Sequence, residues 1–594
     1  IGTIGSTSSS TVTIQDDDVA GPGGVGCALK LWYRPDAGIT GGGSVSSWTD
    51  DSQGVIASAA TSSNEPQFNG GNSDTTFNFQ NYLTFDGSDH RLGIDLSYNS
   101  VSLSKIYTFV AFRTNENAGN FDNWAFLDFD RSEFFNTYIR GDGKVALSYN
   151  SNDFEGSSSF NDNKPHIGGF VFDNSLSEDT KLFADGATEY SNDEKGGSFQ
   201  VGANTTRYGY IGDGSEASTL NGQGNNLYYK GDIAEIIYVE GQTLSSVDIN
   251  QIQTYLALKY GVTLNMTDDP ATSSTDERDY LNSAGNAVWD YSANSGNNSA
   301  IAGLIRDDDA SLEVLKARSV NGGAILTGEV SSLSDQESIV WGHNGQPVET
   351  EKNETGTLTT KLKREWKATE VGQTGNLTLK VDLSNLASIP SSSSDIYLLT
   401  DSDGDFSNAT TLATATSISG SEVTFSNVDI DDGDYFTIGF YEAVIWTGST
   451  WQNGSGSANR PAVADSTRKL FINGSGANIQ SDAIVSYAEI ASGADVTILT
   501  GNSLTVQNEI INDGTVTVNN FGSLVQTHSG ANQNSGSGSY EVKKIGIGNP
   551  NHFNLWSSPI QSADILNTFN GANPCDVFVF DPATQLYSHD YTQG

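Results

Sequence analysis

The chain has 594 residues and carries 29 Lys plus Arg against 73 Asp plus Glu, which gives a formal net charge of -44 at pH 7. A nucleic-acid-binding protein needs basic patches facing the phosphates, and an anionic membrane surface would repel so acidic a chain, so we exclude both partners. Two cysteines, Cys27 and Cys575, are too few for a disulfide scaffold, and we expect each to be a buried free thiol.

Glycine accounts for 64 residues and proline for only 12, while 10% of the residues are aromatic. This composition is typical of many short strands joined by polar turns. We therefore predict an all-β protein of tandem β-sandwiches followed by a small β-solenoid, with one prominent helix at 246–260. No apolar run approaches the roughly 20 residues needed to cross a bilayer, so we expect no membrane insertion.

The first 24 residues are predicted to be the end of one module and a linker. Alternation over 10–15, followed by Asp16, Asp17 and Asp18, resembles the last strand and acidic turn of a Calx-beta module, which implies that 1–18 is its tail. Residues 19–24 are predicted to be a linker from their glycine and proline content. The chain starts within a strand pattern and stops at 594 without a closing element, so we expect further domains of the same polypeptide.

A strand followed by a helix is predicted over 231–261. The β-branched run 233–239 indicates a buried strand. Ser245 and Asp248 have the spacing of a capping box, and Gly261 can end the helix in a left-handed conformation. Four apolar residues then fall on one helical face: Ile249, Ile252, Leu256 and Tyr260.

Three stretches of this region carry a family resemblance. They begin at Leu31, Leu83 and Gly231 and read LWYRPDAG with VSSWTDDS, then LTFDGSD, then GDIAEIIYVEGQTLSSVDINQIQTYLALKYGVTL. In sequence and order they are similar to the laminin-G/concanavalin-like domain of Bacteroidota surface proteins. The resemblance implies a lectin-like jelly roll over 25–265. The whole arrangement resembles cell-surface adhesins exported by the type IX secretion system, which implies an extracellular location.

Three further regions are predicted after the helix. Residues 266–350 are expected to form a β region associated with the lectin-like domain, and the alternating strands of 351–441 indicate an immunoglobulin-like sandwich. Short strands at nearly regular intervals, with glycine and asparagine between them, predict a β-solenoid over 442–535. The last segment, 536–594, is predicted to be a truncated β unit.

Carboxylates in the strand before the helix raise the question of glycoside hydrolysis. Those enzymes need paired carboxylates on one face, and in a strand that requires even spacings. The separations of Asp232, Glu235 and Glu240 are odd, which predicts alternate faces. The histidines are scattered, and neither a zinc-binding motif nor a serine-hydrolase elbow occurs, so we expect no enzyme activity.

Two acidic motifs are candidate calcium sites: Asp401, Asp403 and Asp405, then Asp429, Asp431 and Asp434. Calcium takes six to eight oxygen ligands, and a cation makes closely spaced carboxylates tolerable. The first motif differs from an EF-hand because Gly404 stands at its fourth position. The alternative is that both motifs are ordinary solvated turns.

Glycan binding needs aromatic platforms beside polar groups at the rim or the concave face of a sandwich. The candidates are Trp124, Tyr149, Tyr208, Tyr210 and Asp213. Core packing is the competing explanation for each ring. Two triplets, starting at Asp74 and Asp465, resemble the short O-glycosylation signal of Bacteroidota and would place sugars on Thr75 and Ser466.

These observations favour a non-enzymatic extracellular segment of a large surface adhesin, which presents a lectin-like module on rigid β domains stabilised by calcium. Two alternatives stay open from the sequence. The chain could instead be a carbohydrate-binding accessory region of a secreted polysaccharide-degrading enzyme, or a purely structural stalk.

Overall fold

The computed structural model describes residues 21–26, 29–71, 75–116, 123–131, 135–150, 152–194, 197–267, 277–352, 360–386, 389–390, 393–406, 409–440, 443–466, 468–527, 534–546, 579–581 and 586–588. They form two compact units, Ile1–Glu442 and Ala443–Gly594, each considered by itself. The predicted fold class is confirmed: the described residues are nearly all β, with one α-helix, α1 (Ser246–Tyr260). No helix among them is long and apolar enough to span a membrane.

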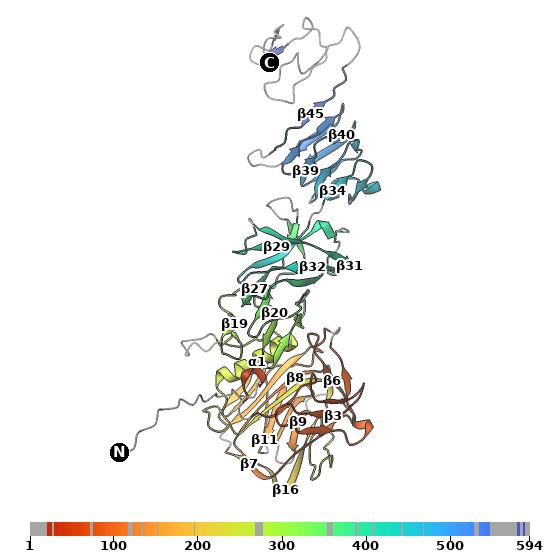
Figure 1. Ribbon diagram of the computed structural model, residues 1–594. Helices are drawn as coiled ribbons and strands as arrows, with labels where there is room; N and C mark the ends of the chain where they lie inside the picture. The colour runs from red at the N-terminus through yellow and green to blue at the C-terminus, as the bar shows by residue number, and fades with distance from the viewer. Residues whose placement is uncertain are drawn as a thin grey trace, which may run out of the picture. The chain divides into compact units, whose positions relative to one another are not determined.

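The first unit begins with a sandwich of two antiparallel sheets, drawn from red to yellow in Figure 1. Sheet A has eight strands: β1 (Leu29–Tyr33), β5 (Gln67–Asn69), β6 (Tyr82–Asp86), β8 (Lys105–Arg113), β13 (His166–Asp173), β14 (Thr180–Ala184), β15 (Ala187–Asn192) and β17 (Lys230–Glu240). Sheet B has nine: β2 (Ile39–Gly41), β3 (Val45–Thr49), β4 (Ile56–Ser58), β7 (Leu92–Leu103), β9 (Asn123–Asp130), β10 (Phe135–Arg140), β11 (Val145–Tyr149), β12 (Asn152–Glu155) and β16 (Phe199–Ile211).

Both faces of sheet A are covered, which explains the continuous apolar runs of its central strands. Every residue of β13 is buried, and the run 233–239 of β17 is buried as predicted. Along β17, Ile236 and Tyr238 point into the core between the sheets, while Ile237 and Val239 face a second core on the outer side. A strand with two buried faces needs apolar residues at successive positions rather than at alternate ones.

Helix α1 covers the outer face of sheet A and has the predicted ends. Ser245 accepts the N–H of Asp248 and Asp248 accepts the N–H of Ser245, which completes the capping box. Gly261 ends the helix with φ 71°. A Cβ at this glycine would lie 2.6 Å from the Arg318 carbonyl oxygen, so the turn leaves no room for a side chain.

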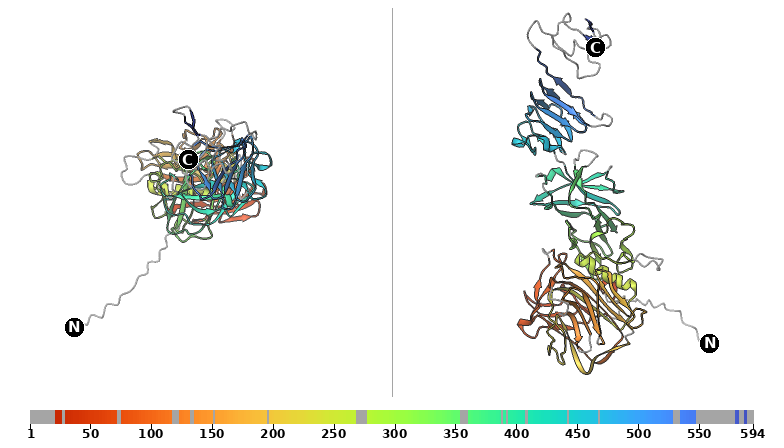
Figure 2. Two further views of the ribbon diagram at one scale, coloured as in Figure 1. Left: turned by 90° about the horizontal axis from the view of Figure 1, so that it is seen from above. Right: turned by 180° about the vertical axis from the view of Figure 1, so that it is seen from behind.

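The prediction of a single apolar face for α1 is incomplete, because the opposite face is buried as well. Its polar residues bond to the backbone of the next domain: Asn250 donates to the Asp279 carbonyl, and Gln251 donates to the carbonyls of Asn282 and Ser283. In Figure 1 and in the rear view of Figure 2, α1 lies between the first sandwich and the strands that follow. The helix therefore joins two domains.

A second antiparallel sandwich follows a short hairpin made of β18 (Tyr280–Leu281) and β19 (Ala287–Trp289). One sheet has nine strands: β20 (Ser299–Asp307), β21 (Leu312–Val314), β24 (Ser338–His343), β25 (Thr350–Lys352), β26 (Thr360–Leu362), β27 (Trp366–Val371), β29 (Ile396–Asp401), β30 (Thr410–Thr414) and β33 (Tyr435–Phe440). The other has five: β22 (Lys316–Ala317), β23 (Leu326–Glu329), β28 (Leu377–Asp382), β31 (Ser417–Ser419) and β32 (Glu422–Val428).

The predicted division into 266–350 and 351–441 is wrong, because both sheets cross it. Strand β24 pairs with β27, and β23 pairs with β28. A sheet is stabilised by hydrogen bonds and side-chain pairs between neighbouring strands, so strands that pair across position 350 belong to one domain.

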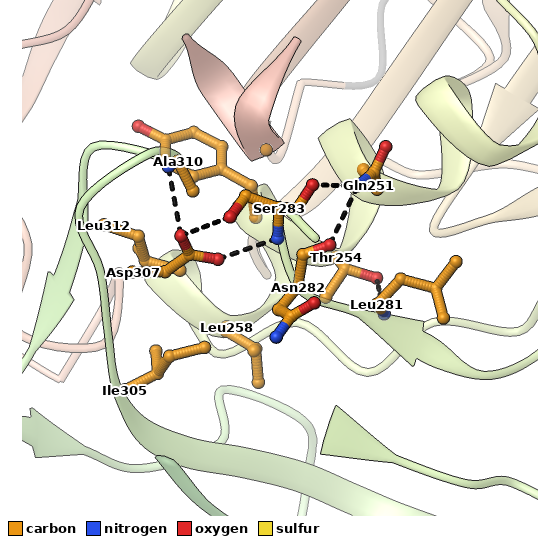
Figure 3. Close-up of a pocket in the computed structure, with 12 residues that line it drawn as sticks. Gln251, Thr254, Leu258, Leu281, Asn282, Ser283, Ile305, Asp307, Ala310 and Leu312 are labelled. Atoms are coloured by element: carbon orange, nitrogen blue, oxygen red, sulfur yellow. Dashed lines mark hydrogen bonds between the residues drawn. The ribbon is translucent and has the colours of Figure 1, made fainter. Parts of the chain in front are cut away.

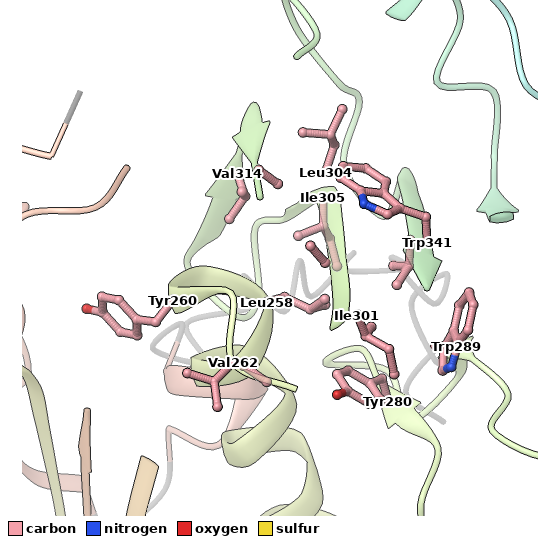
Figure 4. Packing of buried hydrophobic residues seen from close by; sticks show 14 of the residues in the cluster. Leu258, Tyr260, Val262, Tyr280, Trp289, Ile301, Leu304, Ile305, Val314 and Trp341 are labelled. Atoms are coloured by element: carbon pink, nitrogen blue, oxygen red, sulfur yellow. The ribbon is translucent and has the colours of Figure 1, made fainter. Parts of the chain in front are cut away.

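The two sandwiches share one continuous hydrophobic core. It runs from Trp32 and Tyr107 of the first sandwich, through Leu258 of α1, to Ile305 and Trp341 of the second. Figure 4 shows Leu258 pointing toward Ile305 and its neighbours on β20.

Polar contacts fix the same junction. The Asn78 amide donates to the carbonyl oxygens of Leu258 and Lys259 at the end of α1, and it accepts the backbone N–H of Arg318 at 2.6 Å. The predicted linker also belongs to this junction. Residues Pro22–Gly24 form a 3-10 turn, η1, that packs against α1, and Gly23 lies against the backbone of Gln251.

The second unit is a solenoid of about three turns, as predicted. Three sheets build it: β34 (Ala443–Trp446), β35 (Trp451–Gln452), β36 (Lys469–Ile472), β39 (Tyr487–Ile490) and β42 (Ile510–Asn512); β37 (Ala477–Ile479), β40 (Asp495–Ile498), β43 (Thr515–Val518) and β45 (Ser539–Val542); and β38 (Ala483–Val485), β41 (Ser503–Val506) and β44 (Ser523–Gln526). Ile479, Ile498 and Val518 stack in register on parallel strands. Because β45 pairs in parallel with β43, the solenoid continues beyond the predicted end at 535.

The remaining described elements are η2 (Ser62–Asn64), η3 (Ser393–Asp395), η4 (Ser457–Asn459), η5 (Val463–Asp465) and a hairpin of β46 (Val579–Asp581) and β47 (Leu586–Ser588). The predicted Calx-beta tail at 1–18 lies outside the described residues, as do Cys27 and Cys575. Most of the predicted truncated β unit at 536–594 lies outside them as well.

Candidate binding sites

The five residues predicted to bind glycan do not form one platform. Tyr149 and Tyr210 are buried, and the Tyr210 hydroxyl donates to the Gly222 carbonyl, so the prediction that these rings stack on a ligand is wrong. Trp124 is partly exposed but packs against the core between the two sheets. Tyr208 is partly exposed and belongs to neither core of the sandwich. The Tyr149 ring belongs to the core between the sheets, whereas the Tyr210 ring is covered by Arg91 and bonded to the loop at Gly222.

Asp213 is a buried structural carboxylate rather than a free ligand contact. Its side chain is fully buried and accepts Arg91 Nη1 at 2.8 Å together with the backbone N–H groups of Gly214 and Leu227. The loop 212–229 folds over this ion pair. A Cβ at Gly224 would lie 2.0 Å from Arg91 Nη1, so a side chain there would displace the ion pair.

Tyr228 is a candidate ligand contact that sequence reasoning missed. Its neighbour Tyr229 is fully buried, while Tyr228 is partly exposed because successive residues of an extended segment point in opposite directions. The Arg91 guanidinium lies 5.8 Å from the centre of the Tyr228 ring. The only signal for Tyr228 in the sequence was that it directly precedes another tyrosine, so that one ring of the pair should face away from the core.

The loop 86–91 faces the same tyrosine. Asp86 accepts the backbone N–H groups of Ser88, Asp89 and His90, which fixes the turn. Burial raises the pKa of the Tyr228 hydroxyl, and Arg91 opposes the rise. Three nearby carboxylates add to it: Asp213, Asp89 and Asp86. We call Asp86, Asp89, Arg91, Asp213 and Tyr228 the rim cluster.

The first predicted calcium motif forms a compact turn. Carboxylate oxygens of Asp401, Asp403 and Asp405 can lie within 4.8 Å of one another. Asp401 ends β29 and accepts the N–H groups of Asp403 and Gly404 at 2.9 and 2.7 Å. Burial by itself raises the pKa of Asp401, but these backbone bonds lower it below its usual value.

The second predicted motif contributes to the same place through one residue. Strand β29 pairs antiparallel with β33, and Asp401 stands opposite Tyr435. Asp434 immediately precedes Tyr435 in the sequence. Burial raises the pKa of Asp434, and the negative charges of Asp431 and Asp401 raise it further. Asp429 is exposed and is not among the carboxylates of the turn. The two motifs were predicted separately because strand pairing is not visible in either one.

The prediction of alternate faces for the β17 carboxylates is wrong for the first pair. A register shift between Ile233 and Glu235 marks a bulge, and the partners of Asp232 and Glu235 on β8 are Arg113 and Ala111, two positions apart. Both carboxylates therefore lie on the face that α1 covers. Asp232 is almost fully buried and forms an ion pair with Arg113 at 2.5 Å.

Glu235 is fully buried and accepts four donors. They are Trp32 Nε1 at 2.5 Å, the Tyr255 hydroxyl at 2.9 Å, Lys259 Nζ at 2.8 Å and the Tyr260 hydroxyl at 2.6 Å. Lys259 also pairs with Asp36 at 3.0 Å. Burial by itself lowers the pKa of Lys259, but Asp36 and Glu235 raise it well above its usual value. These contacts bind the helix to the sheet and leave Glu235 no access to a substrate.

One small cavity occurs at the junction of the two sandwiches. It is lined by α1, the turn at 282–283 and β20, and its volume is about 10 Å³. Figure 3 shows Gln251 and Asp307 hydrogen-bonded to Ser283 across it. That volume is roughly the space of one water molecule, so the cavity is too small for a sugar.

The two predicted glycosylation residues differ in their surroundings. Thr75 is exposed in a turn, while Asp74 lies outside the described residues. Ser466 is partly buried, and its neighbour Asp465 is fully buried with hydrogen bonds to Ser455 and Ala462. Asp465, the acidic residue of the second triplet, is thus already hydrogen-bonded within the loop that it stabilises.

Comparison with known families gives two matches. Residues 248–434 match the family model described as Domain of unknown function (DUF8202), and residues 445–593 match Domain of unknown function (DUF8693). The first match begins inside α1, so it treats the helix and the second sandwich together. No curated protein matches the chain.

Three solved structures show distant likenesses. Domain 4 of AbnA, an extracellular GH43 arabinanase from Geobacillus stearothermophilus in complex with arabinotriose, is 14% identical with a TM-score of 0.27, and the match covers 38% of this chain and 98% of that one. A Trypanosoma rangeli sialidase is 11% identical, with a TM-score of 0.26 and coverage of 39% and 32%. The CBM40 of a Ruminococcus gnavus IT-sialidase, bound to α2,3 sialyllactose, is 13% identical, with a TM-score of 0.19 and coverage of 26% and 96%.

Replacing Glu235 with glutamine is expected to destabilise the first unit by about 3–5 kcal/mol, because the buried Lys259 ammonium loses its fully buried counter-charge. Chemical denaturation followed by tryptophan fluorescence measures the change. Glu313→Gln is the matched control, since Glu313 is exposed on β21 and the same change should cost less than about 0.5 kcal/mol. Equal stability of the two variants would contradict the role assigned to Glu235.

Proposed function

We propose that this chain is a non-enzymatic segment of a large extracellular adhesin, in which the first sandwich binds a glycan and the other β domains act as rigid spacers. The observation that carries the proposal is the core shared by the two sandwiches. Domains joined by a small polar interface move relative to each other, whereas a large apolar interface holds them as one body. A rigid mount is suited to holding a binding module in a defined orientation.

Further support comes from the residues of the first sandwich. The sequence resemblance over 25–265 is to a lectin-like domain, and loops 86–91 and 212–229 place a partly exposed tyrosine beside an arginine and carboxylates. The two carboxylates on one face of β17, Asp232 and Glu235, are buried and engaged in ion pairs. The acidic composition suits an exported protein that must stay soluble outside the cell.

The full chain is expected to bind at least one class of glycan on an array and to release no oligosaccharide from it. The array gives binding, and product analysis after prolonged incubation tests for cleavage. Absence of binding by folded protein would support the purely structural stalk instead. Release of oligosaccharides would contradict the non-enzymatic assignment.

The proposal includes calcium at the turn formed by Asp401, Asp403 and Asp405, with Asp434 just before the paired strand β33. Like charges raise the pKa of Asp434, and a bound cation would relieve that repulsion. Calcium would then hold the ends of β29 and β33 together.

Calcium is therefore expected to raise the melting temperature of the first unit relative to excess chelator. A ligand that binds only the folded state stabilises it by about 2.7 kcal/mol at 100 times its Kd. Asp403→Asn should greatly reduce the shift, whereas Asp335→Asn, an exposed acid elsewhere in the same sandwich, should retain it. Identical melting with calcium and with chelator would show that the turn is merely solvated.

A further inference from the structure

Two tyrosines of the first sandwich have ring faces that are not used by its cores. Tyr208 and Tyr228 are both partly exposed, and neither belongs to the two hydrophobic clusters of the described sandwich. The other partly exposed tryptophan and tyrosine rings of the sandwich, Trp124 and Tyr190, pack against the core between the sheets. Phe79, which also lies outside both clusters, has the Lys316 ammonium 4.2 Å from its ring centre. A sugar ring stacks its C–H face on an aromatic surface, so Tyr208 and Tyr228 are the available platforms.

Polar surroundings distinguish the two. A saccharide needs hydrogen-bonding groups around the platform, because its hydroxyls must be satisfied when they leave water. Tyr228 has Arg91 5.8 Å from its ring centre, and the negative charges of Asp213, Asp89 and Asp86 raise the pKa of its hydroxyl. Among the described residues, no arginine or lysine lies over the Tyr208 ring as Arg91 lies over that of Tyr228.

The rim cluster is also held in place before any ligand arrives. Asp213 is fully buried and fixes the Arg91 guanidinium, which lies 4.8 Å from the centre of the Tyr210 ring beneath it. Ser215 N–H donates to Asp128 of sheet B, and the Tyr210 hydroxyl holds Gly222, so the loop 212–229 is attached at several points. Groups that are already ordered lose little entropy on binding, which is what a specific site requires.

We propose that the rim cluster is the glycan-binding site and that it takes a neutral saccharide, with Tyr228 as the stacking platform and Arg91, Asp86 and Asp89 as hydroxyl partners. The inference rests on the proposed function and names its site and ligand class. Asp213 already neutralises the Arg91 guanidinium, and the carboxylates of Asp86 and Asp89 add further negative charge near Tyr228. An anionic sugar would therefore meet repulsion, whereas the hydroxyls of a neutral sugar can donate to the carboxylates and accept from the arginine.

The test uses the full chain and the best ligand from the glycan array, with affinity measured by calorimetry for each variant. Tyr228→Ala is expected to weaken binding about tenfold or more, as truncation of a central aromatic contact does. Tyr228→Phe keeps the ring and should stay within about threefold of the parent. Tyr208→Ala is the matched control and should stay within about twofold. Melting temperatures of all variants confirm that they fold.

Each outcome decides the inference. Retention of affinity by Tyr228→Ala would overturn the rim cluster while leaving the proposed function intact, because the chain would still bind a glycan. Loss of affinity in Tyr208→Ala alone would move the site to Tyr208. Preference for sialylated or uronate-containing glycans over neutral ones would overturn the ligand class. If the parent chain binds no glycan, the proposed function fails and the inference fails with it.

Discussion

The buried carboxylate of Glu235 is the constraint on which the arrangement of the first unit depends. Removing an ion from water costs several kcal/mol unless hydrogen bonds and an opposite charge replace the lost hydration. Here one donor comes from β1 and three from α1, so the carboxylate is satisfied only when the helix lies at one place on the sheet. Apolar packing alone would allow the helix to slide along the sheet, whereas these four hydrogen bonds hold it at one position.

Once α1 is fixed, its other face becomes a docking surface for the second sandwich. Asn250 and Gln251 donate to backbone carbonyls that a loose connection would leave in water, and Leu258 extends the core across the junction. The two sandwiches are in this sense one folding unit with a helix at its centre. The family match over 248–434 begins inside the helix, so it groups the helix with the second sandwich instead of placing a boundary after the helix.

Local features could be predicted from the sequence, and features set by distant contacts could not. The helix, its capping box and Gly261 follow from spacings within 16 residues and were predicted correctly. The burial of polar residues such as Gln251 was not predicted, because it depends on a domain that the helix meets only after folding. The bulge in β17 was missed because one extra residue reverses the side on which every later side chain points.

The candidate sites show the same limit. Tyr149 and Tyr210 fitted the composition of a binding surface, but both are buried: the Tyr149 ring lies in the core between the sheets, and Arg91 covers the Tyr210 ring. Tyr228 was missed because only the three-dimensional meeting of loops 86–91 and 212–229 gives it polar neighbours. Likewise, the charge of Asp401 acts on Asp434 because β29 and β33 pair, although the sequence separates the two residues by more than 30 positions.

For the proposed function, the shared core matters because it makes the orientation of the first sandwich a property of the fold. A module on a flexible tether samples many directions, whereas one that shares its core with the next domain cannot turn without exposing apolar surface. The rim cluster is built from loops of the first sandwich, so its geometry is set by the same rigid body. Rigidity at the junction and order at the rim are thus linked.

Native-state hydrogen exchange of the full chain tests the shared core most directly, because it reports the opening free energy of each strand under mild denaturant. Strands β17 and β24, one from each sandwich, represent the two sides of the junction. The account predicts that both lose protection together, with the same dependence on denaturant, in a single opening of the unit. Opening of β24 at a denaturant concentration that leaves β17 fully protected would contradict it.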